Sequence, residues 1–200
     1  MCEEEDVNWY PMRATYSREL KVKDALDSLG IDNYIPMTYG NVKIGDDYRR
    51  QLIPALHNLI FVHSTEDILK NIKANNSLLS SLRFLMKKSV LEKDAKAEIL
   101  TVSSKEMENF IKATKDHEEM ITYLDNQNNQ TTLGDNVRIC GGIFCGVEGQ
   151  IKRIKKNKRV IVCAGSKFTI MLNFVPSSFL EKINNIDEEK ILSPNKSDKR

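Results

Sequence analysis

Side chains that commonly catalyse reactions or bind metals are few and scattered in this sequence. Its cysteines are Cys2, Cys140, Cys145 and Cys163. Its histidines are His57, His63 and His117. No pair of cysteines has the CxxC spacing of a zinc site, and no histidine has the neighbours that a metal site or a catalytic triad needs. We therefore expect reduced cysteines in packing roles, no metal, no cofactor and no enzymatic activity.

Basic side chains are the other candidates for chemistry, and they gather towards the C-terminus. Residues 131–183 carry 9 Lys and Arg against 3 Asp and Glu, whereas residues 1–130 carry 17 against 21. Much of the excess is one run: Lys152, Arg153, Lys155, Lys156, Lys158 and Arg159. Clustered cations bind phosphates by releasing counterions, so this run is a candidate nucleic-acid contact. A solvated hairpin tip is the alternative, and the lack of interleaved aromatics argues against base stacking.

The composition is that of an ordinary globular protein. Of the 200 residues, 40% are hydrophobic and 29% are charged. No apolar run approaches the roughly 20 residues that span a bilayer. The acidic N-terminus is unlike a signal peptide, so we expect a cytoplasmic protein without a membrane partner.

A glycine-rich segment, residues 134–151, predicts two short strands around a tight turn. Val137 and Ile139 alternate with polar neighbours, which is the period of a half-buried strand. Gly141 and Gly142 allow the chain to reverse, and Phe144 supplies an apolar anchor. Further strands are expected at 160–162 and 168–172, with 174–176 closing the sheet and a short helix over 177–183. The polar residues 184–200 predict a disordered tail.

The N-terminal part has a different rhythm, in which strands alternate with helices. Residues 8–15 and 59–62 predict strands, the second central and beside the first strand and a hairpin around Gly40. Helices are expected after three capping residues: Ser17, Ser64 and Ser103. With a strand at 82–86, the order β-α-β-β-α-β-α predicts helices packed on a mainly antiparallel sheet.

The glycine-rich segment resembles the KOW motif, which nucleic-acid-associated proteins carry in an SH3-like barrel. The matching residues are Gly134, Asp135, Val137, Gly142, Phe144, Gly146, Glu148 and Gly149. Both transcription factors and ribosomal proteins have this motif. An RNA-binding ribosomal or assembly protein is therefore one hypothesis.

The strand and helix order ahead of that segment resembles a NusG-type transcription elongation factor. Trp9 and Tyr10 match the Trp-Tyr pair that opens the family's NGN domain, and residues 56–62 match a strand that usually reads Phe-Pro-Gly/Asn-Tyr-Leu-Phe-Val. His57 replaces the usual proline and Leu59 the aromatic residue, which favours a specialised paralogue over a general NusG-like factor. The resemblance implies an α+β fold, with an NGN domain at 8–126 and a KOW SH3-like barrel at 132–183.

Residues 55–62, 104–111 and 176–183 further resemble the UpxY-like branch of bacterial antiterminators. That branch is associated with antitermination in operons for surface, including capsular, polysaccharides. The resemblance therefore implies an operon-specific factor that suppresses pausing or termination.

The family resemblance also implies partners and contact residues. The NGN domain docks on the clamp helices of RNA polymerase, here through Trp9, Tyr10, Arg13, Leu59 and Phe61. Each of these is equally a candidate for the core. Residues expected to meet non-template DNA or nascent RNA are Arg18, Lys21, Lys73 and Asn76. A monomer is expected, with a ribosomal protein or a termination factor as a possible partner of the barrel.

Overall fold

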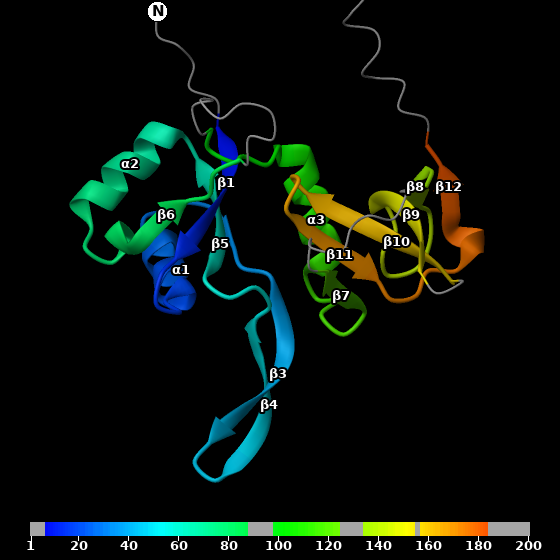
Figure 1. The fold of residues 1–200 in the computed structure, drawn as a ribbon, viewed down its shortest axis with the longest axis horizontal. Helices are drawn as coiled ribbons and strands as arrows, with labels where there is room; N and C mark the ends of the chain where they lie inside the picture. The colour runs from blue at the N-terminus through cyan, green and yellow to red at the C-terminus, as the bar shows by residue number, and fades with distance from the viewer. Residues whose placement is uncertain (1–6, 88–97, 125–133, 155–156, 184–200) are drawn as a thin grey trace, which may run out of the picture.

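The computed structural model describes residues 7–87, 98–124, 134–154 and 157–183 of the chain. Figure 1 shows an N-terminal body and a C-terminal sheet side by side, with helix α3 between them and one hairpin projecting away. The expectations for Lys155, Lys156 and the tail at 184–200 lie outside the described residues.

The N-terminal body is built on an antiparallel sheet with the strand order β2-β5-β1-β6. Its strands are β1 (Asn8–Ala14), β2 (Asn33–Tyr34), β5 (Leu59–Ser64) and β6 (Leu82–Phe84). The pairing of β5 with β1 runs from Asn8 opposite Ser64 to Arg13 opposite Leu59, which confirms the predicted central strand. Helices α1 (Glu19–Ser28) and α2 (Glu66–Asn75) bury Val22, Leu26 and Leu69 against one face.

The projecting hairpin is a separate two-stranded sheet, formed by β3 (Met37–Ile44) and β4 (Asp47–Pro54). Its turn includes Gly45, whose φ of +64° is costly for residues with a Cβ. The prediction of a turn at Gly40 is wrong, because Gly40 lies inside β3 opposite Gln51. The hairpin does not join the main sheet as predicted; the two-residue strand β2 pairs there instead.

Only one of the three predicted helix caps is correct. Ser103 and Glu106 form the full capping box at the start of α3 (Ser104–Thr114). At α2 the capping side chain is Thr65, which accepts from the Ile68 amide at 3.3 Å, so the expectation for Ser64 is wrong by one residue. Ser17 does not cap α1; its own amide donates to Asn58 Oδ1 at 2.7 Å.

The C-terminal sheet has the strand order β12-β8-β9-β10-β11-β7. Its strands are β7 (Ile121–Leu124), β8 (Asn136–Ile139), β9 (Glu148–Ile154), β10 (Asn157–Ala164), β11 (Phe168–Leu172) and β12 (Leu180–Lys182). The predicted alternation in β8 is confirmed, since Val137 and Ile139 are buried. The strand expected at 174–176 is absent from this described segment, and β12 follows a single 3-10 turn, Ser177–Phe179, where a short helix was expected.

Strand β7 ties the two parts of the chain together. It follows α3 and pairs with the outer edge of β11, from Leu124 opposite Thr169 to Ile121 opposite Leu172. An uncovered strand edge exposes unpaired backbone groups, and β7 occupies this one. The segment that leaves the N-terminal body is thus built into the C-terminal sheet.

Candidate functional site

The residues expected to face the polymerase do not all share one surface. Trp9, Leu59 and Phe61 lie on the same face of the N-terminal sheet, because they alternate along β1 and β5 and belong to one buried cluster. Arg13 is exposed at the end of β1. Tyr10 belongs to the opposite cluster, under α1 and α2. Because side chains alternate along β1, Tyr10 points away from the face that carries Trp9.

The face that carries Phe61 is covered. The Phe61 side chain is 0% exposed, and its ring centroid lies 6.0 Å from that of Phe110 in α3. A closer neighbour comes from the C-terminal sheet: the Phe168 ring stands edge-on, 4.9 Å away at 75°. The same apolar cluster continues into Val160 and Val162 of β10. In this arrangement, one core joins the two parts of the molecule.

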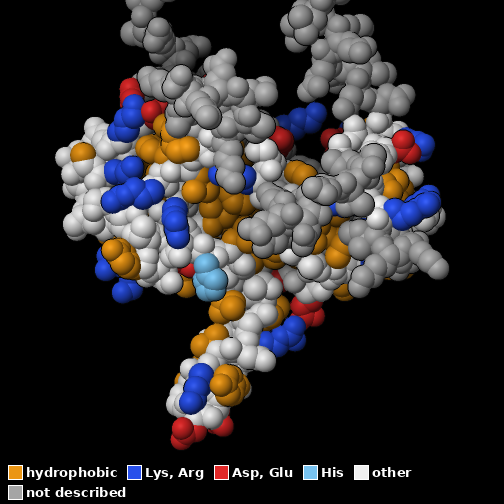
Figure 2. All heavy atoms as spheres, viewed as in Figure 1, with side chains coloured by type: hydrophobic (Ala, Val, Ile, Leu, Met, Phe, Trp, Pro, Cys, Tyr) orange, Lys and Arg blue, Asp and Glu red, His pale blue; other side chains and the backbone are white. Residues whose placement is uncertain are grey.

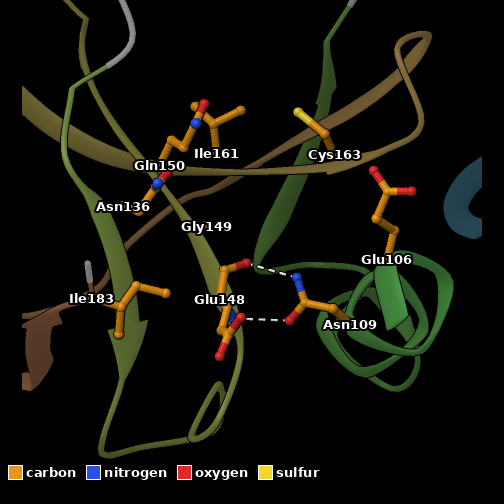
Figure 3. Close-up of a pocket in the computed structure, with 9 residues that line it drawn as sticks. All are labelled: Glu106, Asn109, Asn136, Glu148, Gly149, Gln150, Ile161, Cys163 and Ile183. Carbon is orange, nitrogen blue, oxygen red and sulfur yellow. Dashed lines mark hydrogen bonds between the residues drawn. The ribbon is translucent and has the colours of Figure 1, made fainter. Parts of the chain in front are cut away.

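An amide side chain in α3 completes the backbone hydrogen bonding of β9. Asn109 Nδ2 donates to the Glu148 carbonyl at 2.7 Å, and the Glu148 amide donates to Asn109 Oδ1 at 2.8 Å (Figure 3). The two bonds imitate a neighbouring strand at the point where β9 extends beyond its described pairs with β10. The hollow beside them in Figure 3 is also lined by Glu106 and Cys163.

Three further polar contacts join the N-terminal body to the segments after α3. Lys167 Nζ donates to the Met86 carbonyl at 3.0 Å, and the Tyr123 hydroxyl donates to the Met37 carbonyl at 3.2 Å. Arg50 and Glu119 form an ion pair at 2.6 Å. Exposed ion pairs stabilise by at most about 1 kcal/mol, whereas burying one Phe side chain contributes about 1.5–3 kcal/mol. The buried apolar contacts therefore contribute more than these polar contacts to holding the two parts of the chain together.

A hydrogen-bonded tyrosine fixes the end of α3 to the edge strand β2. The Tyr34 hydroxyl lies 2.6 Å from Thr114 Oγ1, which donates to the Phe110 carbonyl at 2.8 Å. Burial raises the pKa of Tyr34 to about 12, and burial also raises the pKa of Tyr123. Both hydroxyls therefore stay protonated at neutral pH and can donate the hydrogen bonds that position α3 and β7.

One edge of the covered face remains open as a groove. It has a volume of about 340 Å³ and is lined by Arg13, Leu56, His57, Asn58, Leu59, Leu85 and Phe168. His57 and Leu59, which replace the proline and the aromatic residue of the usual family segment, both line this opening. Sequence patterns had not marked Leu85 or Phe168, because in sequence both are ordinary apolar residues of predicted strands.

The residues expected to contact DNA or RNA occupy the helical side of the N-terminal body. Lys73 Nζ lies 4.5 Å from the centre of the Phe84 ring. Burial lowers the pKa of Lys73, and the positive charge of Arg83 lowers it further. Asn76 is committed to the backbone, because its Oδ1 accepts from Leu78 at 2.9 Å and from Leu79. Arg18 and Lys21 are exposed at the start of α1. Arg83, whose charge acts on Lys73, does not belong to this side, because it lies opposite Arg13 in the register of β6 with β1.

The basic run divides between the inside and the outside of the C-terminal sheet. Lys152 is only 5% exposed, so the expectation that it belongs to a surface patch is wrong. Arg153 and Lys158 are exposed and lie opposite each other on β9 and β10, while Arg159 is half-buried. Alternation along β9 explains the difference between Lys152 and Arg153.

The residues that match the KOW motif have structural roles. Val137 and Phe144 are buried, Gly142 and Gly146 have φ of +76° and +81°, and Asp135 and Glu148 form ion pairs with Lys182 and Arg138. A Cβ at Gly134 or Gly149 would lie 2.9 or 2.5 Å from the carbonyl oxygen of Ile151 or Ile161. Backbone contact therefore requires these two glycines.

The helices of the described segments are all too short or too polar to cross a membrane. The family described as "Transcription termination factor nusG" matches residues 7–112. No curated protein matches the chain. The match covers more than half of the sequence and includes every strand and helix of the N-terminal body. The chain belongs to the NusG family of transcription factors.

Proposed function

We propose that this NusG-family chain is an operon-specific, UpxY-like antitermination factor that binds the clamp helices of RNA polymerase. The observation that carries the proposal is the gathering of Trp9, Leu59 and Phe61 on one sheet face, with Arg13 at its rim. The departures at His57 and Leu59 lie at the same rim, and they support a specialised role. A surface polysaccharide operon, capsular in type, is the proposed target.

The C-terminal sheet is proposed to be a KOW-type SH3-like barrel. Five of its strands are arranged in the order β12-β8-β9-β10-β11. In the chain β8 is the first of these strands and β12 is the last, and the two pair with each other. This order and the close backbone contacts of Gly134 and Gly149 support the proposal. The barrel would bind a ribosomal protein or a termination factor.

The proposed mechanism is binding alone, without catalysis. Polymerase must compete with Phe168 for the face around Phe61, because the two rings are in contact when the chain is closed. The apparent affinity then equals the intrinsic affinity reduced by the fraction of open molecules. Once bound, the factor favours a pause-resistant polymerase by holding one conformation over another. Lys73, Arg18 and Lys21 would meet the nucleic acid.

The polymerase contact can be tested by a pull-down on isolated clamp helices. Phe61→Ala, or Leu59→Asp, is expected to weaken capture at least about tenfold, because each removes an apolar contact from the proposed face. Ile60→Ala is the matched control: Ile60 is equally buried on the same strand, but it points to the opposite face. Circular dichroism checks that all three variants stay folded. Equal loss in Phe61→Ala and Ile60→Ala would contradict the assigned face.

The target can be tested by deleting the gene and sequencing transcripts. We expect promoter-distal transcripts of one polysaccharide operon to fall severalfold, while promoter-proximal transcripts of that operon and all other operons stay unchanged. A change across many operons would favour a general NusG-like elongation factor. Co-sedimentation with ribosomes and no effect on transcripts would favour a KOW-type RNA- or ribosome-binding protein.

A further inference from the structure

One face of the projecting hairpin carries aromatic and basic side chains and no acidic side chain. In the register of β3 with β4, Tyr39 lies opposite Leu52, Asn41 opposite Arg50, and Lys43 opposite Tyr48. Side chains two residues apart share a face, so these three pairs form one ladder from the root of the hairpin towards its tip. The other face carries Val42 and Arg49, and Ile44 opposite Asp47.

Most side chains on this face are exposed among the described residues. Tyr48 is 71% exposed, and Tyr39 and Leu52 are 42% and 46% exposed. Figure 2 shows hydrophobic and basic side chains mixed along the hairpin, with acidic ones at its tip. A two-stranded hairpin cannot bury such residues by itself, and exposed apolar clusters commonly mark an interaction site.

The chemistry of the ladder fits a single strand of nucleic acid. Proteins bind such strands by stacking bases on aromatic rings and by placing cations along the phosphates. Successive pairs on one face are about 7 Å apart, so Tyr39 and Tyr48 are separated by roughly 14 Å along the ladder, with Arg50 between them and Lys43 opposite Tyr48. Both charges on this face are positive, which favours a polyanion over a protein of mixed charge.

Arg50, the cation in the middle of this face, already forms an ion pair with an acidic segment of the same chain. The Arg50 guanidinium lies 4.7 Å from the centre of the Tyr39 ring and 2.6 Å from the Glu119 carboxylate. Asp116 and Glu118 line the same groove as Tyr39 and Glu119. These carboxylates belong to the connection between α3 and β7, so they place negative charge where a phosphate would bind.

We propose that the face formed by Tyr39, Asn41, Lys43, Tyr48, Arg50 and Leu52 binds a single strand of nucleic acid, and that Glu119 competes with its phosphates for Arg50. The inference rests on the proposed function, because a factor bound to transcribing polymerase works beside single-stranded DNA and RNA. Tyr48 and Tyr39 stack on bases, while Lys43 and Arg50 contact phosphates. When the connection after α3 moves away, Arg50 becomes free and the strand binds more tightly.

The test uses fluorescence anisotropy with the full chain, without polymerase, on 12-nucleotide oligo-dT, oligo-rU and a DNA duplex. Tyr48→Ala and Arg50→Ala are expected to weaken single-strand binding about tenfold each, because each removes a stacking or phosphate contact. Tyr48→Phe keeps the ring and should bind as the parent chain does. Arg49→Ala makes the same charge change on the opposite face and should alter affinity less than twofold. Glu119→Gln should tighten binding severalfold.

Three results would overturn the proposal: equal weakening by Arg49→Ala and Arg50→Ala, binding of the duplex as tight as that of the single strands, or no oligonucleotide binding. If no oligonucleotide binds and Tyr48→Ala loses capture by clamp helices, the face docks a protein. The oligo-dT and oligo-rU arms show whether DNA or RNA is preferred. Clamp-helix capture by Tyr48→Ala is expected to be normal, so failure of this proposal is distinguishable from failure of the polymerase contact.

Discussion

Phe168→Asp is expected to raise the affinity of the chain for polymerase clamp helices by at least about tenfold. The substitution replaces the ring that stands 4.9 Å from Phe61 with a carboxylate, which loses solvation if the two parts stay closed. A penalty of about 1.4 kcal/mol on the closed state already corresponds to a tenfold change in its equilibrium. Affinity can be measured by titrating labelled clamp helices.

The matched control for this experiment is Phe174→Asp. Phe174 follows the same strand but is 73% exposed, so the same change there leaves the closed contact intact. Limited proteolysis and small-angle scattering should show that only Phe168→Asp separates the two parts. If Phe168→Asp binds clamp helices no better than Phe174→Asp does, the covered face is not the polymerase face.

Gly149→Ala is expected to lower the free energy of unfolding by about 1–3 kcal/mol, the usual cost of forcing extra atoms into a packed site. A Cβ at this position would lie 2.5 Å from the Ile161 carbonyl oxygen and 2.8 Å from Val160 Cγ1. Two backbone segments would have to move apart to admit it. Urea unfolding followed by fluorescence and circular dichroism measures the change.

Gly40→Ala is the informative comparison. A Cβ at Gly40 would also collide with a neighbour, but that neighbour is the Cδ1 atom at the end of the Ile53 side chain. A side-chain end can rotate away, whereas a paired backbone carbonyl cannot, so Gly40→Ala should cost less than about 1 kcal/mol. If Gly149→Ala lowers the free energy of unfolding as little as Gly40→Ala does, the contact of β9 with β10 yields more easily than its geometry implies.

Local patterns predicted much of the secondary structure. The alternation of Val137 and Ile139 and the capping box of Ser103 with Glu106 both depend on neighbours within a few residues, so the sequence displays them directly. Ser17 is not the cap because α1 begins one residue later, after Arg18, and Ser17 has a φ of +51° in a turn that is held by Asn58, which is 41 residues away in sequence. The hairpin turn was misplaced because glycine suits both a turn and the interior of an exposed strand.

The site was harder to predict, because it depends on which surfaces meet. The sequence could place Trp9, Leu59 and Phe61 on strands, but only their register puts them on one face and excludes Tyr10. Phe168 became part of the site through contact between distant segments, and one sequence read locally carries no signal for such a contact. Likewise, Lys152 is buried and its neighbour Arg153 is exposed because side chains alternate along β9, and the sequence does not show which of the two faces inward.

The Asn109 contact has a consequence for how closure depends on the state of β9. Asn109 grips the backbone amide and carbonyl of residue 148, groups that every amino acid except proline provides. These two hydrogen bonds therefore do not depend on which side chain is present at position 148, but they require an extended strand there. Loss of that strand would therefore remove both hydrogen bonds between α3 and β9 without any change to the side chain of Asn109.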